Sequence, residues 1–179
     1  EDRLVAIMFG QSPELEAALR ELPEAQAKKA REEFQERIKG MVETAGGRYL
    51  KPMIDNGFLV QFGAPIAREG DLELTVKTAL DIKDMTTAFA REQGVEKPVG
   101  VKLGVNEGSV TITESQTPSG PIMDLIGSPA NVAARLMMKA KPGQVIVKGD
   151  IHRLIKSDFK SSGQGRVELK GIAEPVNIF

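Results

Sequence analysis

The chain opens with an uninterrupted apolar run, Leu4 to Phe9, which has the length of a strand. A run without polar alternation is typical of a central strand that is covered on both faces. Further along, apolar residues recur at helical spacing from Ala30 to Val42 and again from Leu72 to Phe89. This spacing predicts two amphipathic helices. Glycines mark the ends of both, at Gly46-Gly47 and near Gly94, because glycine is favoured just beyond a helix.

Cap and turn residues place the borders of the first helical part and of a hairpin. Ser12 and Pro13 offer an N-cap and a first-turn proline, and the helix restarts after Pro23. Two strand candidates follow, Arg48 to Met53 and Gly57 to Phe62. The Asp-Asn-Gly run between them is tight-turn chemistry, so we expect a β-hairpin here.

A second hairpin is predicted after the second long helix. The segment Val99 to Val105 alternates apolar with polar or small residues, and the Asn-Glu-Gly run at 106–108 has turn chemistry. The chain is then expected to return through Val110 and Ile112. Thr113 to Pro121 has the composition of a polar loop.

The C-terminal third is predicted to hold shorter elements. Ser128-Pro129 offers a cap and a first helical residue for a helix that extends to Lys141. A short strand, a short helix and two closing strands are expected at 145–147, 150–157, 167–169 and 176–179. The order begins β-α-β-β-α-β. The expected fold class is therefore α/β (α+β), with a ferredoxin-like βαββαβ core and additional C-terminal strands and helices.

Composition narrows the classes of partner and compartment. The chain has 179 residues, 41% hydrophobic and 27% charged, which fits one water-soluble domain. Its net charge of −1 gives no general attraction for nucleic acid, and no apolar run approaches the roughly 20 residues of a membrane span. The absence of cysteine excludes disulfides and thiolate metal sites and suits the cytoplasm. Because the chain starts at Glu1 without a signal pattern, we expect residues 1–179 to be a single domain of a longer multidomain protein.

Four ordered motifs resemble the catalytic domain of class III nucleotide cyclases, the adenylate and guanylate cyclases. A Gly-Gly-Arg helix end leads to a Phe-Gly-Ala-Pro exit within residues 45–65, and residues 124–136 (DLIGSPANVAARL) are similar to the most informative stretch of the family. Two later landmarks follow in order, at 141–144 and 169–176. The resemblance covers nearly the whole chain and implies a class III cyclase fold.

The resemblance also implies an activity and a subunit arrangement. The family forms a cyclic nucleotide and pyrophosphate from a nucleoside triphosphate, with Mg²⁺ or Mn²⁺ at the interface of a head-to-tail dimer. One subunit supplies metal-binding aspartates, and the other supplies base and transition-state contacts. Asn131 and Arg135 match the family's catalytic residues that orient the ribose and stabilise the charge on the transferring phosphate. Four residues apart on a helix, they would project from one face.

Three further residues are expected to bind the substrate. The resemblance places Lys51 and Asp124 at the purine pocket and Lys170 at the triphosphate. A carboxylate that accepts and an ammonium that donates complement the amino group and the ring nitrogen of adenine. Guanine presents a carbonyl where adenine has its amino group. ATP is therefore the expected substrate, and guanylate cyclase activity is the alternative.

The metal-binding half departs from the family pattern. Where the family has an aspartate after the first strand, this chain has Gln11, which is neutral and cannot replace a carboxylate. The phosphate loop that follows in the family is replaced by Ser-Pro-Glu at 12–14. Asp55 matches the second metal aspartate, but the turn is one residue longer than usual, so Asn56 competes for that position. A plain turn aspartate explains Asp55 equally well.

Three functions are open from the sequence. The first is a purine nucleotide cyclase domain that converts ATP to cyclic AMP and pyrophosphate, weak or inactive alone because of Gln11. The second is a catalytically degenerate cyclase-like domain that acts as a heterodimer partner and completes a site with a subunit holding both aspartates. The third is a nucleotide-binding or dimerisation module in signalling. A homodimer and a heterodimer are both compatible with these functions.

Overall fold

The computed structural model describes residues 2–50, 57–117, 120–126, 128–170, 172 and 174–179, and it describes the backbone alone for residue 2 and for the described part of 111–128. The helices are α1 (Pro13–Arg20), α2 (Glu24–Thr44), α3 (Asp71–Glu92), α4 (Ser128–Lys139) and α5 (Gly149–Ile155). The strands are β1 (Asp2–Gln11), β2 (Arg48–Leu50), β3 (Gly57–Phe62), β4 (Lys102–Thr117), β5 (Gly120–Ile126), β6 (Val145–Ile146), β7 (Gly165–Val167) and β8 (Val176–Ile178).

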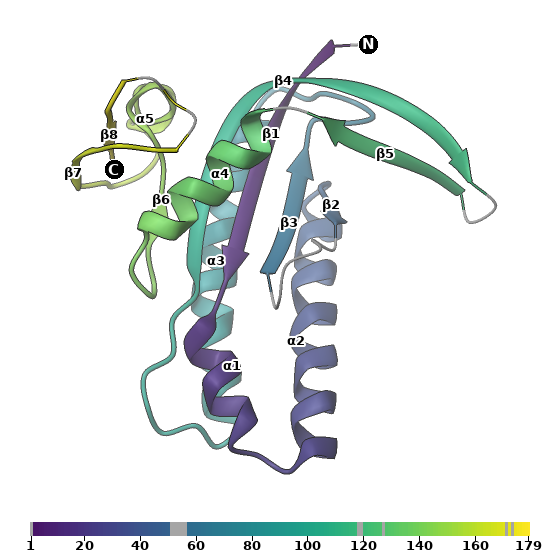
Figure 1. Cartoon of the computed structure of the whole chain (residues 1–179), viewed down its shortest axis with the longest axis vertical. Helices are drawn as coiled ribbons and strands as arrows, with labels where there is room; N and C mark the ends of the chain where they lie inside the picture. The colour runs from purple at the N-terminus through teal and green to yellow at the C-terminus, as the bar shows by residue number, and fades with distance from the viewer. Residues whose placement is uncertain (1, 51–56, 118–119, 127, 171, 173) are drawn as a thin grey trace.

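One mixed sheet forms the centre of the fold. Its strands follow the order β2-β3-β1-β4-β5 with antiparallel neighbours, and β6 adds to β4 in parallel. The strands β7 and β8 pair with each other and lie beside α5 (Figure 1). Strands β1 to β4 with their connecting helices are the ferredoxin-like βαββαβ core, and the later elements extend it. The predicted fold class is confirmed.

Helices cover both faces of this sheet. The long helices α2 and α3 pack on one face, and α4 lies across the other (Figure 1). Residues of β1 alternate between the two layers: Ala6 and Met8 belong to the core under α2 and α3, whereas Val5, Ile7 and Phe9 belong to the core under α4. The uninterrupted apolar run of the sequence is therefore a strand buried on both sides, as predicted.

The predicted hairpin at residues 106–108 is wrong, because β4 is one continuous strand. Residues 102–111 pair with β1 along its whole length, without a turn. Asn106 is only 3% exposed, and its Nδ2 donates to the carbonyl oxygen of Pro129 at 3.2 Å. Asn106 thus lies within a strand and contacts α4, and this tertiary contact overrides the local turn signal.

The predicted polar loop from Thr113 to Pro121 is also wrong. The strand β4 continues to Thr117 and pairs with β5, with Thr111 opposite Ile126 and Thr117 opposite Gly120. Strand preference depends on what lies alongside, and here the pairing of two backbones overrides a polar composition. The hairpin of this region therefore lies later in the chain than the sequence predicts.

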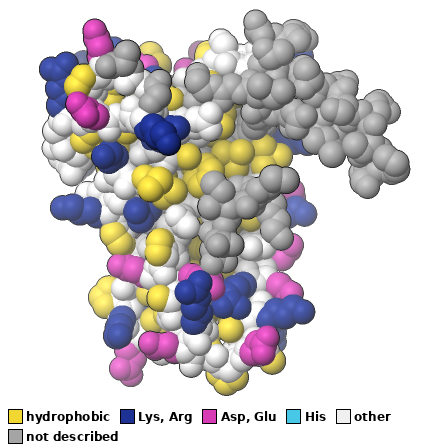
Figure 2. All heavy atoms as spheres, in the orientation of Figure 1, with side chains coloured by type: hydrophobic (Ala, Val, Ile, Leu, Met, Phe, Trp, Pro, Cys, Tyr) yellow, Lys and Arg dark blue, Asp and Glu magenta, His cyan; other side chains and the backbone are white. Residues whose placement is uncertain are grey.

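The described surface mixes charges of both signs. Figure 2 shows Lys and Arg side chains interspersed with Asp and Glu at the end of the molecule where α1 meets α2. No helix in the described ranges combines the length and the apolar character that crossing a bilayer demands.

Candidate functional site

The outward face of α4 carries Asn131 and Arg135. The helix buries Ala133, Leu136 and Met137, and helical spacing puts Asn131 and Arg135 on the opposite side. Asn131 is exposed and Arg135 is partly buried. Neither side chain has a hydrogen-bond or ion-pair partner among the described residues. Both groups are therefore available to a ligand or to a second subunit.

The end of β1 brings a cation next to Gln11. In the sheet Gln11 lies opposite Gly57 on β3 and opposite Lys102 on β4. Residues directly opposite each other in antiparallel strands project from the same face, so Lys102 stands beside Gln11. This strand end therefore carries an amide and an ammonium where a metal cage would need carboxylates.

The corner between β1 and α1 is fixed to the start of the β4 segment. The Ser12 hydroxyl accepts from the backbone N–H of Leu15 at 3.3 Å as an N-cap, and it donates to the carbonyl oxygen of Gly100 at 2.9 Å. The N–H of Gly100 donates to the Glu14 carboxylate at 3.0 Å. Ser12 and Glu14 thus occupy both backbone polar groups of Gly100. We call this arrangement, together with Glu16, the β1–α1 corner.

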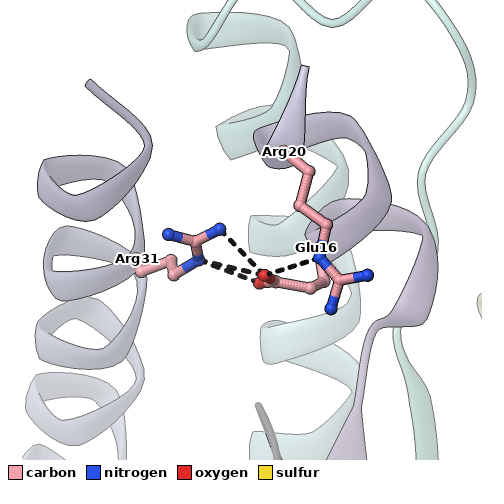
Figure 3. A network of polar contacts seen from close by, with 3 residues as sticks. All are labelled: Glu16, Arg20 and Arg31. Atoms are coloured by element: carbon pink, nitrogen blue, oxygen red, sulfur yellow. Dashed lines mark hydrogen bonds and ion pairs between the residues drawn. The ribbon is translucent and has the colours of Figure 1, made fainter. Parts of the chain in front are cut away.

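Glu16 ties α1 to α2 by an ion pair that Figure 3 shows from close by. Nε of Arg31 donates to both carboxylate oxygens of Glu16 at 3.1 Å, and its Nη2 donates to one of them at 2.9 Å. Arg20, one turn further along α1, approaches the same carboxylate at 3.5 Å. The Glu16 carboxylate raises the pKa of Arg31 above its ordinary value, chiefly through these hydrogen bonds. Both charged groups are therefore engaged within the chain.

Little space remains on the side of this corner that faces α2, whereas a hollow of about 360 Å³ lies on the side of Glu14 and Gly100. A cavity of about 30 Å³ lies between α1, α2 and β3, with Ser12, Glu16 and Tyr49 in its lining. A cavity needs roughly 10 to 15 Å³ to hold one water molecule, so this one has room for water but not for a triphosphate.

Residues 2–179 match the sequence model of one family, the adenylate and guanylate cyclase catalytic domain. The chain belongs to this family. The resemblance to class III cyclases is thereby confirmed.

Proteins from several organisms are similar to this chain in sequence or fold. The putative adenylate cyclase 3 of Rhizobium meliloti (strain 1021) is 28% identical over 148 residues, 82% of this chain but only 22% of the length of that relative. The adenylyl cyclase CyaB from P. aeruginosa has a similar fold, with a TM-score of 0.88 and 20% identity over 99% of this chain and 93% of that chain. A dimeric guanylyl cyclase domain from the fungus Blastocladiella emersonii has a TM-score of 0.84 and 18% identity over 99% of this chain and 96% of that chain. At these identities the solved structures show the fold alone.

The described residues of the cyclase domain contain no assembled metal cage. No group of three or more His, Asp and Glu side chains within the described ranges is placed to hold a metal ion. Gln11 and Lys102 share the strand end, and the nearby Glu14 carboxylate is bonded to Gly100. Asp55, the predicted metal ligand, and its competitor Asn56 lie outside the described residues.

The remaining predicted site residues are placed only in part. Lys51 lies outside the described residues. Asp124 is on β5 opposite Thr113, and the structure describes its backbone alone. Lys170 is exposed and follows Leu169, which packs in one cluster with Leu136 of α4. Among the predicted residues, the structure thus brings together Asn131 and Arg135, and their roles stay predictions.

Sequence reasoning missed the contacts that hold these parts of the cyclase domain in place. The sequence indicates Glu14 only as part of the segment that replaces the phosphate loop, and Asn106 only as a turn residue. A signal was present for Asn106, because glycines two residues away on either side often mark a close approach of another backbone to a strand. No local signal identified Gly100, whose partners lie 86 and 88 positions earlier in the sequence.

Proposed function

We propose that this cyclase domain supplies the nucleotide-binding and transition-state half of a site that converts ATP to cyclic AMP and pyrophosphate. The observation that carries the proposal is the Asn131 and Arg135 pair, which projects from α4 without a described partner. An amide can orient the ribose, and a guanidinium can neutralise charge that builds on the transferring phosphate. In this reaction the ribose 3′ oxygen bonds to the α-phosphorus, pyrophosphate leaves, and the 3′ proton passes to a base or to water.

A second subunit is part of this proposal. The pair faces away from its own sheet, so another surface has to enclose the substrate. A similar guanylyl cyclase domain from Blastocladiella emersonii forms a non-canonical dimer in one crystal structure and is monomeric in another. In a homodimer both sites would contain Gln11, whereas a partner cyclase domain with its own aspartates would bring Mg²⁺ or Mn²⁺ to one of them. A heterodimer therefore fits the described residues better than a homodimer.

ATP is the proposed substrate. Asp124 accepts and Lys51 donates, a pair that complements the adenine edge, and Lys170 would contact the triphosphate. The substrate and the cysteine-free sequence favour a cytoplasmic location.

The test is cyclic AMP production by the purified protein with Mg²⁺ or Mn²⁺, alone and mixed with a second subunit. That subunit should be a cyclase domain with both metal aspartates in which the residues corresponding to Asn131 and Arg135 have been replaced. We expect little or no product from either protein alone and clear activity from the mixture, with ATP preferred over GTP. Vigorous activity of this chain alone contradicts the role of Gln11, and no gain on mixing contradicts the proposal.

The β1–α1 corner favours a second candidate, a non-catalytic module that binds nucleotide or only dimerises. The Ser12, Glu14 and Glu16 side chains of this corner are engaged within the chain, so none of these three groups is free for a metal triphosphate. Calorimetry with ATP in the absence of any partner separates the possibilities. Heat of binding without product on mixing supports a nucleotide-binding module, and dimerisation without heat supports a dimerisation module.

A further inference from the structure

Three alternate residues of β4, Gly104, Asn106 and Gly108, form the surface on which α4 rests, and we call them the α4 seat. Residues two positions apart in a strand face the same side of a sheet, and this side is the one that α4 crosses (Figure 1). A methyl group on Gly108 would stand 2.6 Å from Cγ of Pro129, in the first turn of α4. A methyl group on Gly104 would overlap the carbonyl oxygen of Ala133. The helix therefore lies as close to β4 as glycine alone permits.

Asn106, between these glycines, bonds to the first turn of α4. Its Nδ2 donates to the carbonyl oxygen of Pro129 at 3.2 Å, and the side chain is 3% exposed. In an α-helix that carbonyl can also accept from the N–H four residues further on, so the helix does not need Asn106 to satisfy its backbone. The bond instead links the helix to a fixed point of the sheet.

The same side chain carries a cost. Oδ1 of Asn106 is buried and has no hydrogen-bond partner among the described residues. A buried acceptor without a partner destabilises the folded state, and an apolar side chain of similar size would avoid this cost. The presence of an amide at position 106 is therefore better explained by its effect on the position of α4 than by a contribution to stability.

We infer that Asn106 is a positioning residue which, with Gly104 and Gly108, sets the height and rotation of α4 and so the place of Asn131 and Arg135. Its bond reaches Pro129, two residues before Asn131. This inference rests on the proposed function, because the position of Arg135 matters only if it meets a transition state. Misplacing a catalytic group by about 1 Å can lower a rate about 100-fold.

The first test is Asn106→Leu, which keeps a similar side-chain volume and removes the donor. The assay uses the mixed dimer described above, in which α4 of this chain is the sole source of the Asn and Arg contacts. We expect kcat to fall about 10- to 100-fold, and KM for ATP to change less than about threefold because the proposed base contacts are elsewhere. The melting temperature should stay the same or rise. An unchanged kcat overturns the inference.

Gln61→Leu is the matched control. Gln61 is on β3 and fully buried, and within the described part of the chain neither of its amide atoms has a hydrogen-bond partner. This substitution also replaces a buried amide by leucine in the same sheet, but the Gln61 amide makes no hydrogen bond to the described residues of α4. It should leave kcat unchanged. An equal loss in both variants would mean a general effect on the sheet and would overturn the role of Asn106.

A spectroscopic readout separates this inference from the proposed function. The chain has no cysteine, so spin labels can be placed at Lys139→Cys on α4 and Lys77→Cys on α3 without background; both lysines are exposed. In Asn106→Leu we expect the distance distribution between the labels to shift or broaden, and in Gln61→Leu we expect no change. If the mixed dimer of the unmodified chain makes no product, the proposed function fails, and the distances alone decide about the seat. Identical distributions in all three proteins overturn it.

A second variant covers the case in which Asn106→Leu does not fold. Gly108→Ala adds a methyl group under Pro129 and should displace α4, with the same loss of kcat and the same change in label distance. Gly40→Ala on α2 is its control, because a methyl group there meets no atom within 4 Å. Unchanged kcat and label distances in Gly108→Ala count against the seat.

Discussion

The outward face of α4 and the β1–α1 corner treat their polar side chains in opposite ways. On α4, Asn131 and Arg135 face away from the sheet and have no described partner. At the corner, Ser12, Glu14 and Glu16 all bond to groups of the same chain. One region offers its polar groups to a ligand, and the other uses them to hold the fold.

This difference teaches that charge alone does not identify a site. The corner has a helix N-terminus, which favours anions, and carboxylates, which favour cations. Yet Ser12 caps the helix, and the Glu14 carboxylate already accepts from Gly100. The α4 face has fewer charges, but its Arg135 makes no bond to the described residues of the chain. Whether a group is engaged within the chain separates the two regions better than the type of residue.

Arg135→Lys should give the largest effect, because it removes the planar fork from the open region and keeps the charge. We expect kcat of the mixed dimer to fall about 100-fold or more, the size of effect seen when a transition-state donor is lost. The melting temperature should not change, since Arg135 has no described partner. Arg153→Lys on the exposed side of α5 is the control and should keep full activity. If the mixed dimer with Arg135→Lys has a near-normal kcat, the outward face of α4 is not part of the catalytic site.

Much of the fold could be predicted because its signals are local and repeated. The buried run of β1, the Ser12 cap, the restart after Pro23 and the glycines after α2 and α3 each agree with the structure. The region from β4 to β5 could not be predicted in the same way. Its turn-like Asn-Glu-Gly run is governed by α4, which lies 20 and more residues later in the chain.

The candidate site was predictable to a different degree in its two regions. Spacing alone places Asn131 and Arg135 on one helix face, and the family motif selects them. The state of the corner could not be predicted, because the sequence shows that Gln11 and Glu14 are present but not that Glu14 bonds to Gly100. Contacts over such sequence separations depend on the assembled sheet.

Glu16→Ala tests whether the corner is structural. Removing the carboxylate leaves Arg31 without its bidentate partner, and hydrogen bonds between charged groups contribute about 1 to 3 kcal/mol. We expect that loss in the free energy of unfolding, measured with urea, and unchanged kcat in the mixed dimer below the unfolding range. Glu33→Ala is the control, because the Glu33 to Arg37 pair is exposed and should matter by less than about 0.5 kcal/mol. A loss of kcat under conditions in which the variant is still folded would assign the corner a catalytic role.

Ser12→Ala should have a smaller effect on the same measurement. The substitution removes the N-cap of α1 and the bond to the carbonyl oxygen of Gly100. Loss of a cap costs about 1 kcal/mol, and Ser12→Thr should retain most of it. Equal stability of Ser12→Ala and the unmodified protein would show that the corner is held by Glu14 and Glu16 alone.

Gln11→Asp should have the smallest effect on activity. It tests directly whether the β1–α1 corner differs from the α4 face by more than one missing carboxylate. If a missing carboxylate were the sole defect, this change would restore activity to the protein without a partner. We expect a gain of less than about threefold in cyclic AMP production with Mn²⁺, because one added carboxylate would stand beside Lys102, and Ser12 and Glu14 would stay bonded to Gly100. Gln11→Asn is the control for a change of side-chain length. A strong, Mn²⁺-dependent gain in Gln11→Asp alone would show that the corner can open to a metal triphosphate despite its internal bonds, and the contrast between the two regions would then reduce to a single residue.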